Sequence, residues 1–493
     1  MANQAPQAPA SLVEMLTASG GAEPAGFLND IVANLWPNIC VAGSKIVKES
    51  VEPILASTLP GPLKNLRFVK LDFGHVPIGF SNVDVHKTKN NGIKLDMDMN
   101  WDGVCDFELD GKLVPKVGVE KVRMRGRISV LLCPLTNVIP LIGAAQVAFL
   151  NTPKLELDFT DAANIADLSI IDSTVRKIIL GIIGGMFVLP NRFLVKMDNN
   201  VDYFRTYQPN HGLVRITVAR ATNIAAPKQG EKKSTISKLM EKVKLKDVPD
   251  CYAKVIVGAE PEWKSSVVDN NTNPEWNETH DFIVTDFEQD ITVDIQDEDT
   301  ATGDDDIGMA STTVKDILLQ GGTQELSLSH KGTQTGGRVL IHAKFLNFVN
   351  NAQVLSSAHA QGNQQGQYVG LATILIASAN DLQGPREELQ PSVKVTWGTH
   401  TFQTAVKTYT PGTDIYNPSF DQAFRVPLTA DMLANPGSFK FALLNKTTEF
   451  GSAQIGWQDV LGAEGMMVEN SFDVGNGARI RAAVILNGVQ LAE

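Results

Sequence analysis

Two stretches of the chain, residues 212–348 and 367–493, each contain a series of short apolar strands separated by turn-forming residues. They open with similar strands, at residues 213–218 and 370–376. Segments of this length with this strand spacing predict two successive β-sandwiches, and the similar openings indicate an internal duplication. The residues between them, 349–366, are mostly small and polar and predict a linker.

Residues 23–208 have a different pattern and predict a separate α+β domain. Apolar residues recur at helical spacing over residues 27–36, are interrupted by Pro37, and resume as far as Pro53. This pattern predicts either two short helices or one helix kinked at Pro37. A further helix is predicted around residues 170–187.

Two long segments of this domain alternate between apolar and polar residues, which predicts strands with one dry face and one wet face. The apolar positions are Ile93, Leu95, Met97, Met99, Val122, Met124 and Ile128. The opposite, polar positions include Lys94, Asp96, Asp98, Arg123, Arg125 and Arg127. On spacing alone, packing in a closed core is the favoured interpretation of the apolar faces.

The balance of charges limits the classes of function. The 493 residues are 43% hydrophobic and 20% charged, the composition of an ordinary multidomain globular protein. There are 43 Lys and Arg against 55 Asp and Glu, and this net charge of −12 disfavours a general nucleic-acid binder, which needs a basic surface. The four cysteines are scattered, which predicts reduced thiols in a cytosolic protein.

The pattern of a secretory signal or of a membrane-spanning helix is not found. Residues 1–22 are small and polar and predict a disordered N-terminal segment. Residues 130–150 are apolar but interrupted by Pro134 and Pro140, and residues 178–189 are shorter than the roughly 20 residues that a spanning helix needs. Both stretches are expected to be buried in a soluble domain.

Motifs of catalysis are lacking as well. The sequence has no Gly-x-Ser-x-Gly elbow, no glycine-rich phosphate loop with Lys-Ser/Thr and no His-Glu-x-x-His, and its eight histidines are scattered. A non-enzymatic protein is therefore expected.

The strongest local signal lies in the first sandwich. Asp-Glu-Asp stands at residues 297–299 and Gly-Asp-Asp-Asp-Ile-Gly at 303–308, after Asn-Pro-Glu-Trp-Asn at 273–277 and Asp-Cys-Tyr-Ala-Lys-Val at 250–255. In their order and spacing, these motifs resemble C2 domains. A C2 domain is accordingly expected over residues 212–348.

The resemblance implies calcium binding, with the ligands on the matching positions Asp250, Asp297, Asp299 and Asp305. Calcium takes six to eight oxygen ligands, which converging carboxylates supply. Cys251 replaces the usual proline, and the family's remaining aspartate is not placed by spacing in the long loop 223–250, where Glu231 or Asp247 could substitute. The alternative is a solvated acidic turn.

The same loop carries seven lysines, with Ile236, Leu239, Met240 and Val243 at helical spacing. This predicts a short basic amphipathic helix that contacts an anionic membrane. Its membrane-contact residues would be Lys232, Lys233, Lys238 and Lys242. The alternative is a helix folded back on its own sandwich.

Residues 367–493 resemble a C2 domain more weakly. In the third loop of this second domain, the positions that match the calcium ligands of the family are occupied by Asn445, Thr447 and Ala453. Neutral side chains do not offset the dehydration of a divalent cation, so this second domain is expected not to bind calcium.

The amino-terminal domain carries a third resemblance. Val-Lys-Leu-Asp-Phe-Gly at residues 69–74, Ile-Pro-Leu-Ile-Gly-Ala at 139–144 and Val-Leu-Pro-Asn-Arg at 188–192 resemble the SMP domains of extended synaptotagmins and tricalbins. The order of an SMP domain followed by C2 domains is also that of this family. The resemblance implies a tubular, TULIP-like fold that dimerises end to end, with a groove for glycerophospholipid tails that the seven apolar strand residues named above would line.

The resemblance implies a cytoplasmic protein, peripheral on membranes, that tethers them and transfers lipid, as at contact sites between the endoplasmic reticulum and the plasma membrane. The first C2 domain would dock on an anionic membrane with calcium. Residues 1–22 lack the family's usual hydrophobic hairpin, so tethering would need another anchor, a partner or the second C2 domain. The alternative is a structural or signalling adaptor that does not transport lipid.

Overall fold

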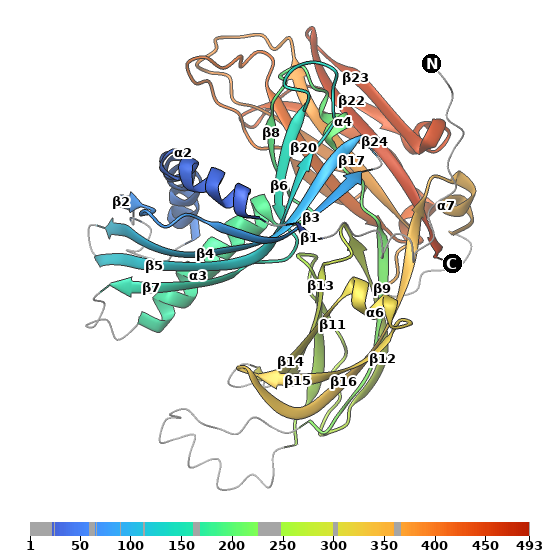
Figure 1. Cartoon of the computed structure of the whole chain (residues 1–493). Coiled ribbons are helices and arrows are strands. Elements are labelled where there is room, and N and C mark those ends of the chain that lie inside the picture. Colours follow the sequence, from blue (N-terminus) through green and yellow to red (C-terminus); the bar gives the residue numbers. More distant parts are fainter. Residues whose placement is uncertain are drawn as a thin grey trace. The chain divides into compact units, whose positions relative to one another are not determined.

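The computed structural model describes residues 22–23, 25–58, 65, 67–88, 90–111, 114–160, 168–224, 248–298, 304–358 and 366–492 (Figure 1). They form two compact units. One contains the residues up to Val201 together with Glu288–Asp290, and the other contains Asp202–Phe287 and the chain from Ile291 onward. In the described ranges, no helix has both the length and the apolar character needed to cross a bilayer.

The first unit is built on an eight-stranded antiparallel sheet in the order β1-β3-β4-β5-β6-β8, with β2 beside β4 and β7 beside β5. The strands are β1 (Ala22–Glu23), β2 (Arg67–Asp72), β3 (Gly79–Thr88), β4 (Gly92–Gly111), β5 (Val114–Leu132), β6 (Ala144–Phe149), β7 (Lys154–Thr160) and β8 (Phe193–Lys196). Met97 lies opposite Ile128 and Trp101 opposite Met124. The two predicted long strands are therefore neighbours, and their apolar residues share one face.

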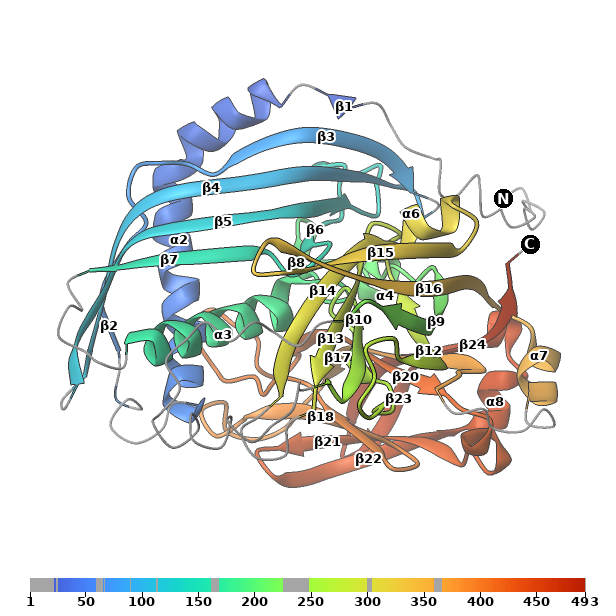
Figure 2. The same cartoon turned by 90° about the horizontal axis from the view of Figure 1, so that it is seen from below.

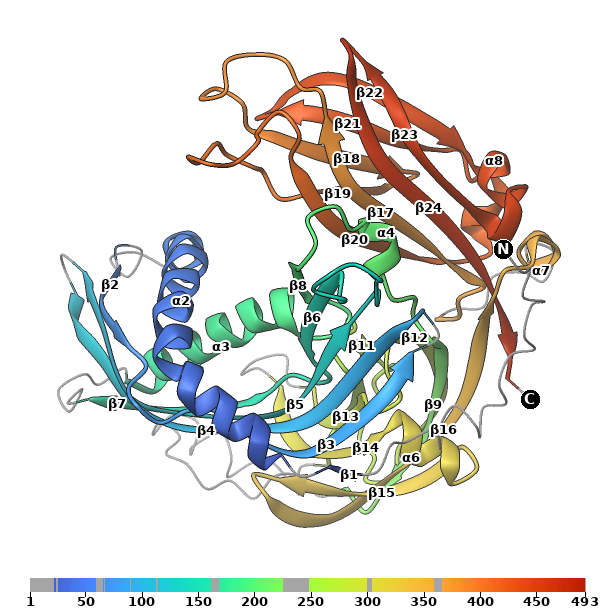
Figure 3. The same cartoon turned by 45° about the horizontal axis from the view of Figure 1, so that its top comes forward.

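Two helices, α2 (Gly26–Thr58) and α3 (Leu168–Phe187), lie on the concave side of this curved sheet (Figure 3). Of the two alternatives for the first segment, the structure has one helix, which passes through Pro37 and bends along its length (Figure 2). Proline lacks the amide donor that would continue the helical hydrogen bonds, which explains a bend in this helix. The helix packs on the sheet through Trp36, whose ring centroid lies 5.8 Å from that of Trp101.

The polar face of β4 is not wet throughout, and at Asp96 the prediction of a wet face is wrong. The Asp96 side chain is buried, and Lys94 Nζ donates a hydrogen bond to its Oδ2 at 2.7 Å. His86 Nε2 lies 3.5 Å from the same oxygen, and the buried Ser129 stands directly opposite on β5. A carboxylate is buried here because the ammonium group of Lys94 compensates its charge.

The second unit contains two β-sandwiches. In the first, the two layers have the strand orders β11-β10-β13-β14 and β12-β9-β16-β15, and they are joined at one edge where β14 pairs with β15 at Met309 and Ser329. Its elements are β9 (Gly212–Thr222), β10 (Cys251–Val257), β11 (Trp263–Lys264), β12 (Glu275–Val284), β13 (Asp290–Asp297), β14 (Asp305–Thr313), α6 (Val314–Leu319), β15 (Thr323–His330) and β16 (Thr333–Val349). The predicted opening and closing strands pair, with Val218 opposite Ile341.

The second sandwich has sheets β19-β18-β21-β22 and β20-β17-β24-β23. Its elements are β17 (Gly370–Asn380), β18 (Pro391–Trp397), β19 (His400–Gln403), β20 (Ser419–Leu428), η4 (Asp431–Ala434), β21 (Ser438–Asn445), β22 (Thr448–Gly456), α8 (Trp457–Leu461), η5 (Glu464–Met466), β23 (Met467–Gly475) and β24 (Ala478–Leu491). Strand β24 also pairs with β16 of the first sandwich, with Leu346 opposite Leu491. The same strand order in both sandwiches supports the duplication inferred from their openings.

Two segments differ from their expected roles. The segment 349–366, expected as a linker, contains α7 (Ala352–Ala358), and Leu355 of this helix is buried in the core of the second sandwich. Residues 202–208, expected at the end of the first domain, lie in the second unit and include α4 (Tyr203–Thr206). Asp202 Oδ2 lies 2.9 Å from Arg481 Nη2 of β24, an ion pair that ties this segment to the second sandwich.

Candidate functional site

Two of the four predicted calcium ligands meet at one tip of the first sandwich. The pairing of β10 with β13 places Cys251 opposite Asp297. The backbone amide of Asp250 donates a hydrogen bond to Asp297 Oδ1 at 2.8 Å, and Asp250 Oδ1 accepts one from the backbone amide of Asn270 at 2.7 Å. Three loops of the sandwich therefore converge on these two carboxylates.

The other predicted ligands are less defined. Asp305 is exposed at the start of β14, and its two neighbours have partners of their own. Tyr252 donates its phenol hydrogen to Asp304 Oδ2 at 2.5 Å, and Asp306 Oδ2 lies 3.3 Å from His330 Nδ1. The described residues contain no group of three or more His, Cys, Asp or Glu side chains placed to hold a metal ion.

Several predicted site residues lie outside the described residues. They are Asp299, the substitutes Glu231 and Asp247, and the membrane-contact residues Lys232, Lys233, Lys238 and Lys242. The full calcium ligand set and the basic membrane-contact helix therefore stay predictions.

The carboxylates of Asp250 and Asp297 oppose the ionisation of the neighbouring Cys251 thiol. Burial, the larger cause, and the charges of Asp297 and Asp250 together raise the pKa of Cys251 to about 12. A potential that opposes a thiolate favours a cation at the same place. The buried thiol is not expected to react with solutes.

The tip of the second sandwich has the same backbone geometry without the charge. The Gln390 amide donates to Asn445 Oδ1 at 2.7 Å, which reproduces the bond between Asp250 and Asp297. Asn445 thus occupies the position of Asp297, as the alignment of the two loops predicted.

A second matching bond joins the first and second loops of each sandwich. The Asn223 amide donates to Asn273 Oδ1 at 2.9 Å, and the Asp381 amide donates to Asn417 Oδ1 at 3.0 Å. The two bonds place the Asn-Pro motifs of both sandwiches at equivalent sites. This supports the assignment of equivalent loop positions in the two C2 domains.

The structure places most of the predicted lipid-lining residues in tight packing. Met97, Met99 and Ile128 are buried in one cluster, and Val122 is buried in the cluster around Trp36. The remaining three, which are half-buried, are Ile93, Leu95 and Met124. The closed-core interpretation accounts for the buried four.

A different apolar surface, on helix α2, is exposed to solvent. Helix α2 exposes a large apolar residue every four positions, and we call these residues the α2 stripe: Phe27, Ile31, Leu35 and Ile39. Their side chains are 68%, 50%, 47% and 38% exposed, whereas Trp36 on the adjacent face of the helix is buried. The apolar face of α2 is thus wider than the sheet covers. The helical periodicity of residues 27–36 predicted the helix, but not that part of its apolar face stays exposed.

Comparison with known proteins identifies the family. Residues 21–198 match the model of the synaptotagmin-like mitochondrial-lipid-binding domain, and residues 212–329 and 370–470 match that of the C2 domain. Over 288 residues the chain is 31% identical to extended synaptotagmin-2-A of Xenopus laevis, a match that covers 57% of this chain and 32% of the relative. The chain belongs to the extended-synaptotagmin-like family.

Further matches agree with this extended-synaptotagmin-like assignment. The chain is 29% identical to extended synaptotagmin-1 of Mus musculus, over 68% of this chain and 30% of the relative. It therefore spans about a third of the length of these curated relatives. The solved structure of the SMP, C2A and C2B domains of extended synaptotagmin 2 has the same fold, with a TM-score of 0.63 at 23% identity over 95% of this chain and 100% of that one. The predicted α+β SMP domain and two C2 sandwiches are confirmed.

Proposed function

We propose that this extended-synaptotagmin-like protein transfers glycerophospholipid between membranes without any covalent step. The observation that carries the proposal is the α2 stripe, which leaves four large apolar side chains open on the SMP domain. Apolar surface of this kind on a folded domain marks a binding site. Burial of each acyl methylene contributes about 0.8 kcal/mol, so two lipid tails supply ample driving force.

The position of the stripe supports a lipid ligand. It lies beside the packed cluster of Trp36 and Trp101, so bound acyl chains would extend an existing apolar core. The half-buried Ile93, Leu95 and Met124 are the predicted lining residues that remain partly accessible. Methionine adapts to chains of varied shape.

Native mass spectrometry of the purified 493-residue chain, with lipid extraction, tests this proposal. Stoichiometric glycerophospholipid would support it and would justify a transfer assay between donor and acceptor liposomes. A lipid-free protein would favour the adaptor function instead, and the apolar strand faces would then be ordinary core.

We further propose that the first C2 domain docks on anionic membranes with calcium. Asp250 and Asp297 lie together at its tip, where the backbone amide of Asp250 donates to Asp297 Oδ1 and the amide of Asn270 to Asp250 Oδ1. The ligand set would be completed by Asp299 and Asp305, and the lysines of loop 223–250 would contact the anionic headgroups. Sedimentation with phosphatidylserine vesicles, with calcium and with a chelator, tests this docking.

The SMP domain is also proposed to form a homodimer. Between β5 and β6 the chain exposes Val138, Ile139 and Leu141, and Ile139 is 89% exposed. The turn is held by hydrogen bonds from the amide of Leu141 to the carbonyl of Val138 at 2.6 Å and from the amide of Thr136 to the carbonyl of Leu141 at 2.8 Å. A rigid, uncharged apolar tip of this kind fits a second copy of the chain. A peripheral position at membrane contact sites would follow from these activities together.

A further inference from the structure

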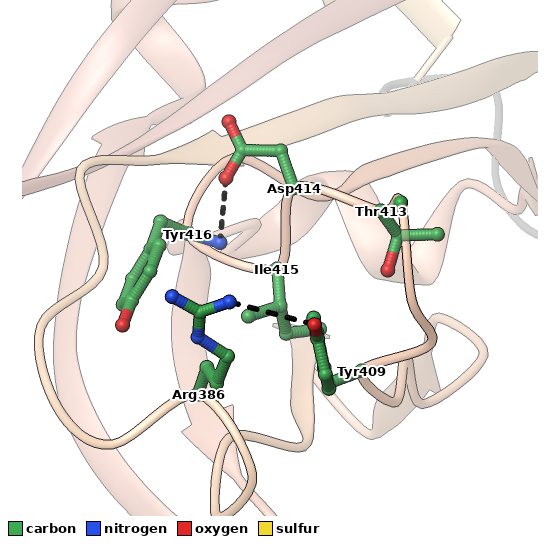
Figure 4. Close-up of a pocket in the computed structure, with 7 residues that line it drawn as sticks. Arg386, Tyr409, Thr413, Asp414, Ile415 and Tyr416 are labelled. Atoms are coloured by element: carbon green, nitrogen blue, oxygen red, sulfur yellow. Dashed lines mark hydrogen bonds between the residues drawn. The ribbon is translucent and has the colours of Figure 1, made fainter.

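A pocket of about 340 Å³ opens at the tip of the second C2 domain, where the loop after β17 meets the loop before β20 (Figure 4). Its lining includes Arg386 from the first loop and Tyr409, Asp414, Ile415 and Tyr416 from the second. This is the end of the sandwich that carries the acidic ligands in the first C2 domain. We propose that the pocket binds a phosphate group, and that it does so without calcium.

The pocket is built on a fixed frame. Ile415 is buried and forms part of the core at the base of the pocket. Tyr409 and Tyr416 are half-buried and pack against the same core, so their rings are held in place. A pocket with an apolar base and a few converging polar groups is the usual form of a small-ligand site.

Arg386 supplies the positive charge. Its guanidinium lies 5.4 Å from the centre of the Tyr409 ring, and its Nη1 donates to the Tyr409 hydroxyl across 3.4 Å. Figure 4 shows the guanidinium between the two tyrosine side chains, with a phenol oxygen on either side of it. The planar guanidinium and the phenol hydroxyls together present several donors to one space, which suits the oxygens of a phosphate.

The nearby carboxylates leave this charge available. Asp414 accepts from the backbone amide of Tyr416 at 3.1 Å and from Asn417 Nδ2 at 2.8 Å, so its oxygens are occupied within their own loop. Glu387 Oε1 lies 4.0 Å from Arg386 Nε, an exposed pair of the kind that contributes little. A phosphate would offer Arg386 a stronger, bidentate partner.

Two neutral side chains explain why calcium is not needed. Gln390 and Asn445 stand where the first C2 domain has Asp250 and Asp297. The second tip therefore lacks the two carboxylates that, at the first tip, would repel an anion until a cation neutralised them. The phosphate could belong to a lipid headgroup or to a free phosphate compound, and both present the same oxygens.

The test uses the full chain in the presence of a calcium chelator. Binding to vesicles of equal parts phosphatidylcholine and phosphatidic acid is compared with binding to phosphatidylcholine alone, and inorganic phosphate is titrated as a competitor. Arg386→Gln is expected to weaken binding by about ten-fold or more, since hydrogen bonds to charged groups are lost. Tyr416→Phe, which keeps the ring, is expected to weaken it less.

The control is Arg338→Gln, which removes an equally charged, exposed arginine from the first C2 domain. Retained binding in this variant would support the pocket, and an equal loss in both variants would overturn it as general charge attraction. If only inorganic phosphate binds, measured by calorimetry and lost in Arg386→Gln, the source is a soluble phosphate. No binding of either probe would overturn the proposal and would leave the calcium docking and lipid transfer proposed above unaffected.

Discussion

The backbone amide of Asp250 donates a hydrogen bond to the carboxylate of Asp297 across 2.8 Å and so joins two loops of the first C2 tip. In the second C2 domain the amide of Gln390 donates to Asn445 Oδ1 across 2.7 Å. A neutral amide oxygen therefore holds the same backbone geometry that the carboxylate holds. The charge of Asp297 is not needed for the fold of the tip, which makes it available for a cation.

Asp297→Asn should separate calcium binding from folding. The asparagine oxygen can accept the Asp250 amide as Asn445 accepts that of Gln390, so stability should change by no more than about 0.5 kcal/mol. Calcium-dependent sedimentation with phosphatidylserine vesicles should be lost, because one charged ligand is removed. The two quantities are measured by thermal unfolding and by the vesicle assay.

The reverse change, Asn445→Asp, is the matched control. It restores one carboxylate to the second tip, but the other two loop positions remain Thr447 and Ala453. No calcium response should appear in this domain. Calcium-dependent docking that survives in Asp297→Asn would contradict the proposed ligand set.

Lipid binding by the SMP domain should depend on the α2 stripe. The double variant Ile31→Gln with Leu35→Gln adds polar groups where acyl chains would pack, so the lipid that copurifies should fall several-fold. The helix should persist, because Trp36 and the residues that pack on the sheet are unchanged. Lipid extraction with mass spectrometry measures the effect.

Val41→Gln is the control for this experiment, because Val41 is 74% exposed on the same helix but lies outside the stripe. It should copurify as much lipid as the unaltered chain. A double variant that retains its lipid but becomes monomeric would assign the stripe to a protein interface instead.

Dimer formation should respond to the apolar turn between β5 and β6. Ile139→Asp places a charge on its most exposed residue, and burying that charge against a second copy would be costly. The variant should shift from dimer to monomer in light scattering. The control is Val406→Asp, at an exposed aliphatic residue of the second C2 domain, which should remain a dimer. An unchanged mass for Ile139→Asp would exclude this turn as the interface.

The sequence was informative where a pattern is local. Alternation identified strands β4 and β5, and the loop motifs identified Asn445 as the counterpart of Asp297. It was less informative where the outcome depends on register and neighbours. Asp96 is buried only because Lys94 and His86 come together around it, which depends on how β3 and β4 pair.

The same limit applies to helix α2 and to the segment 349–366. Periodicity showed that residues 27–36 have an apolar face, but the fraction of that face covered by the sheet depends on the tertiary fold. The polar composition of residues 349–366 indicated a linker, yet Leu355 is buried in the core of the second sandwich. Tertiary contacts decided both cases.

The stability of the second unit, which contains the two C2 domains, should depend on pH through His280. This half-buried side chain is stacked on Trp263 at 5.6 Å and lies edge-on to Phe282 and Tyr368. Its Nδ1 has no hydrogen-bond partner among the described residues. Burial lowers the pKa of His280 below its ordinary value of 6.5, and the charge of Asp281 opposes this only in part.

The direction of the change in stability follows from the different affinities of His280 for a proton in the folded and unfolded states. Below about pH 6.5 the unfolded chain binds a proton at this histidine that the folded chain resists, so stability is full above that pH and falls as the pH drops toward the lowered folded pKa. His280→Phe keeps the aromatic packing and cannot titrate, so its melting temperature should fall less on acidification. Thermal unfolding of both chains at neutral and mildly acidic pH measures the difference. Equal decreases in the two chains would mean that other groups, and not His280, set the pH dependence.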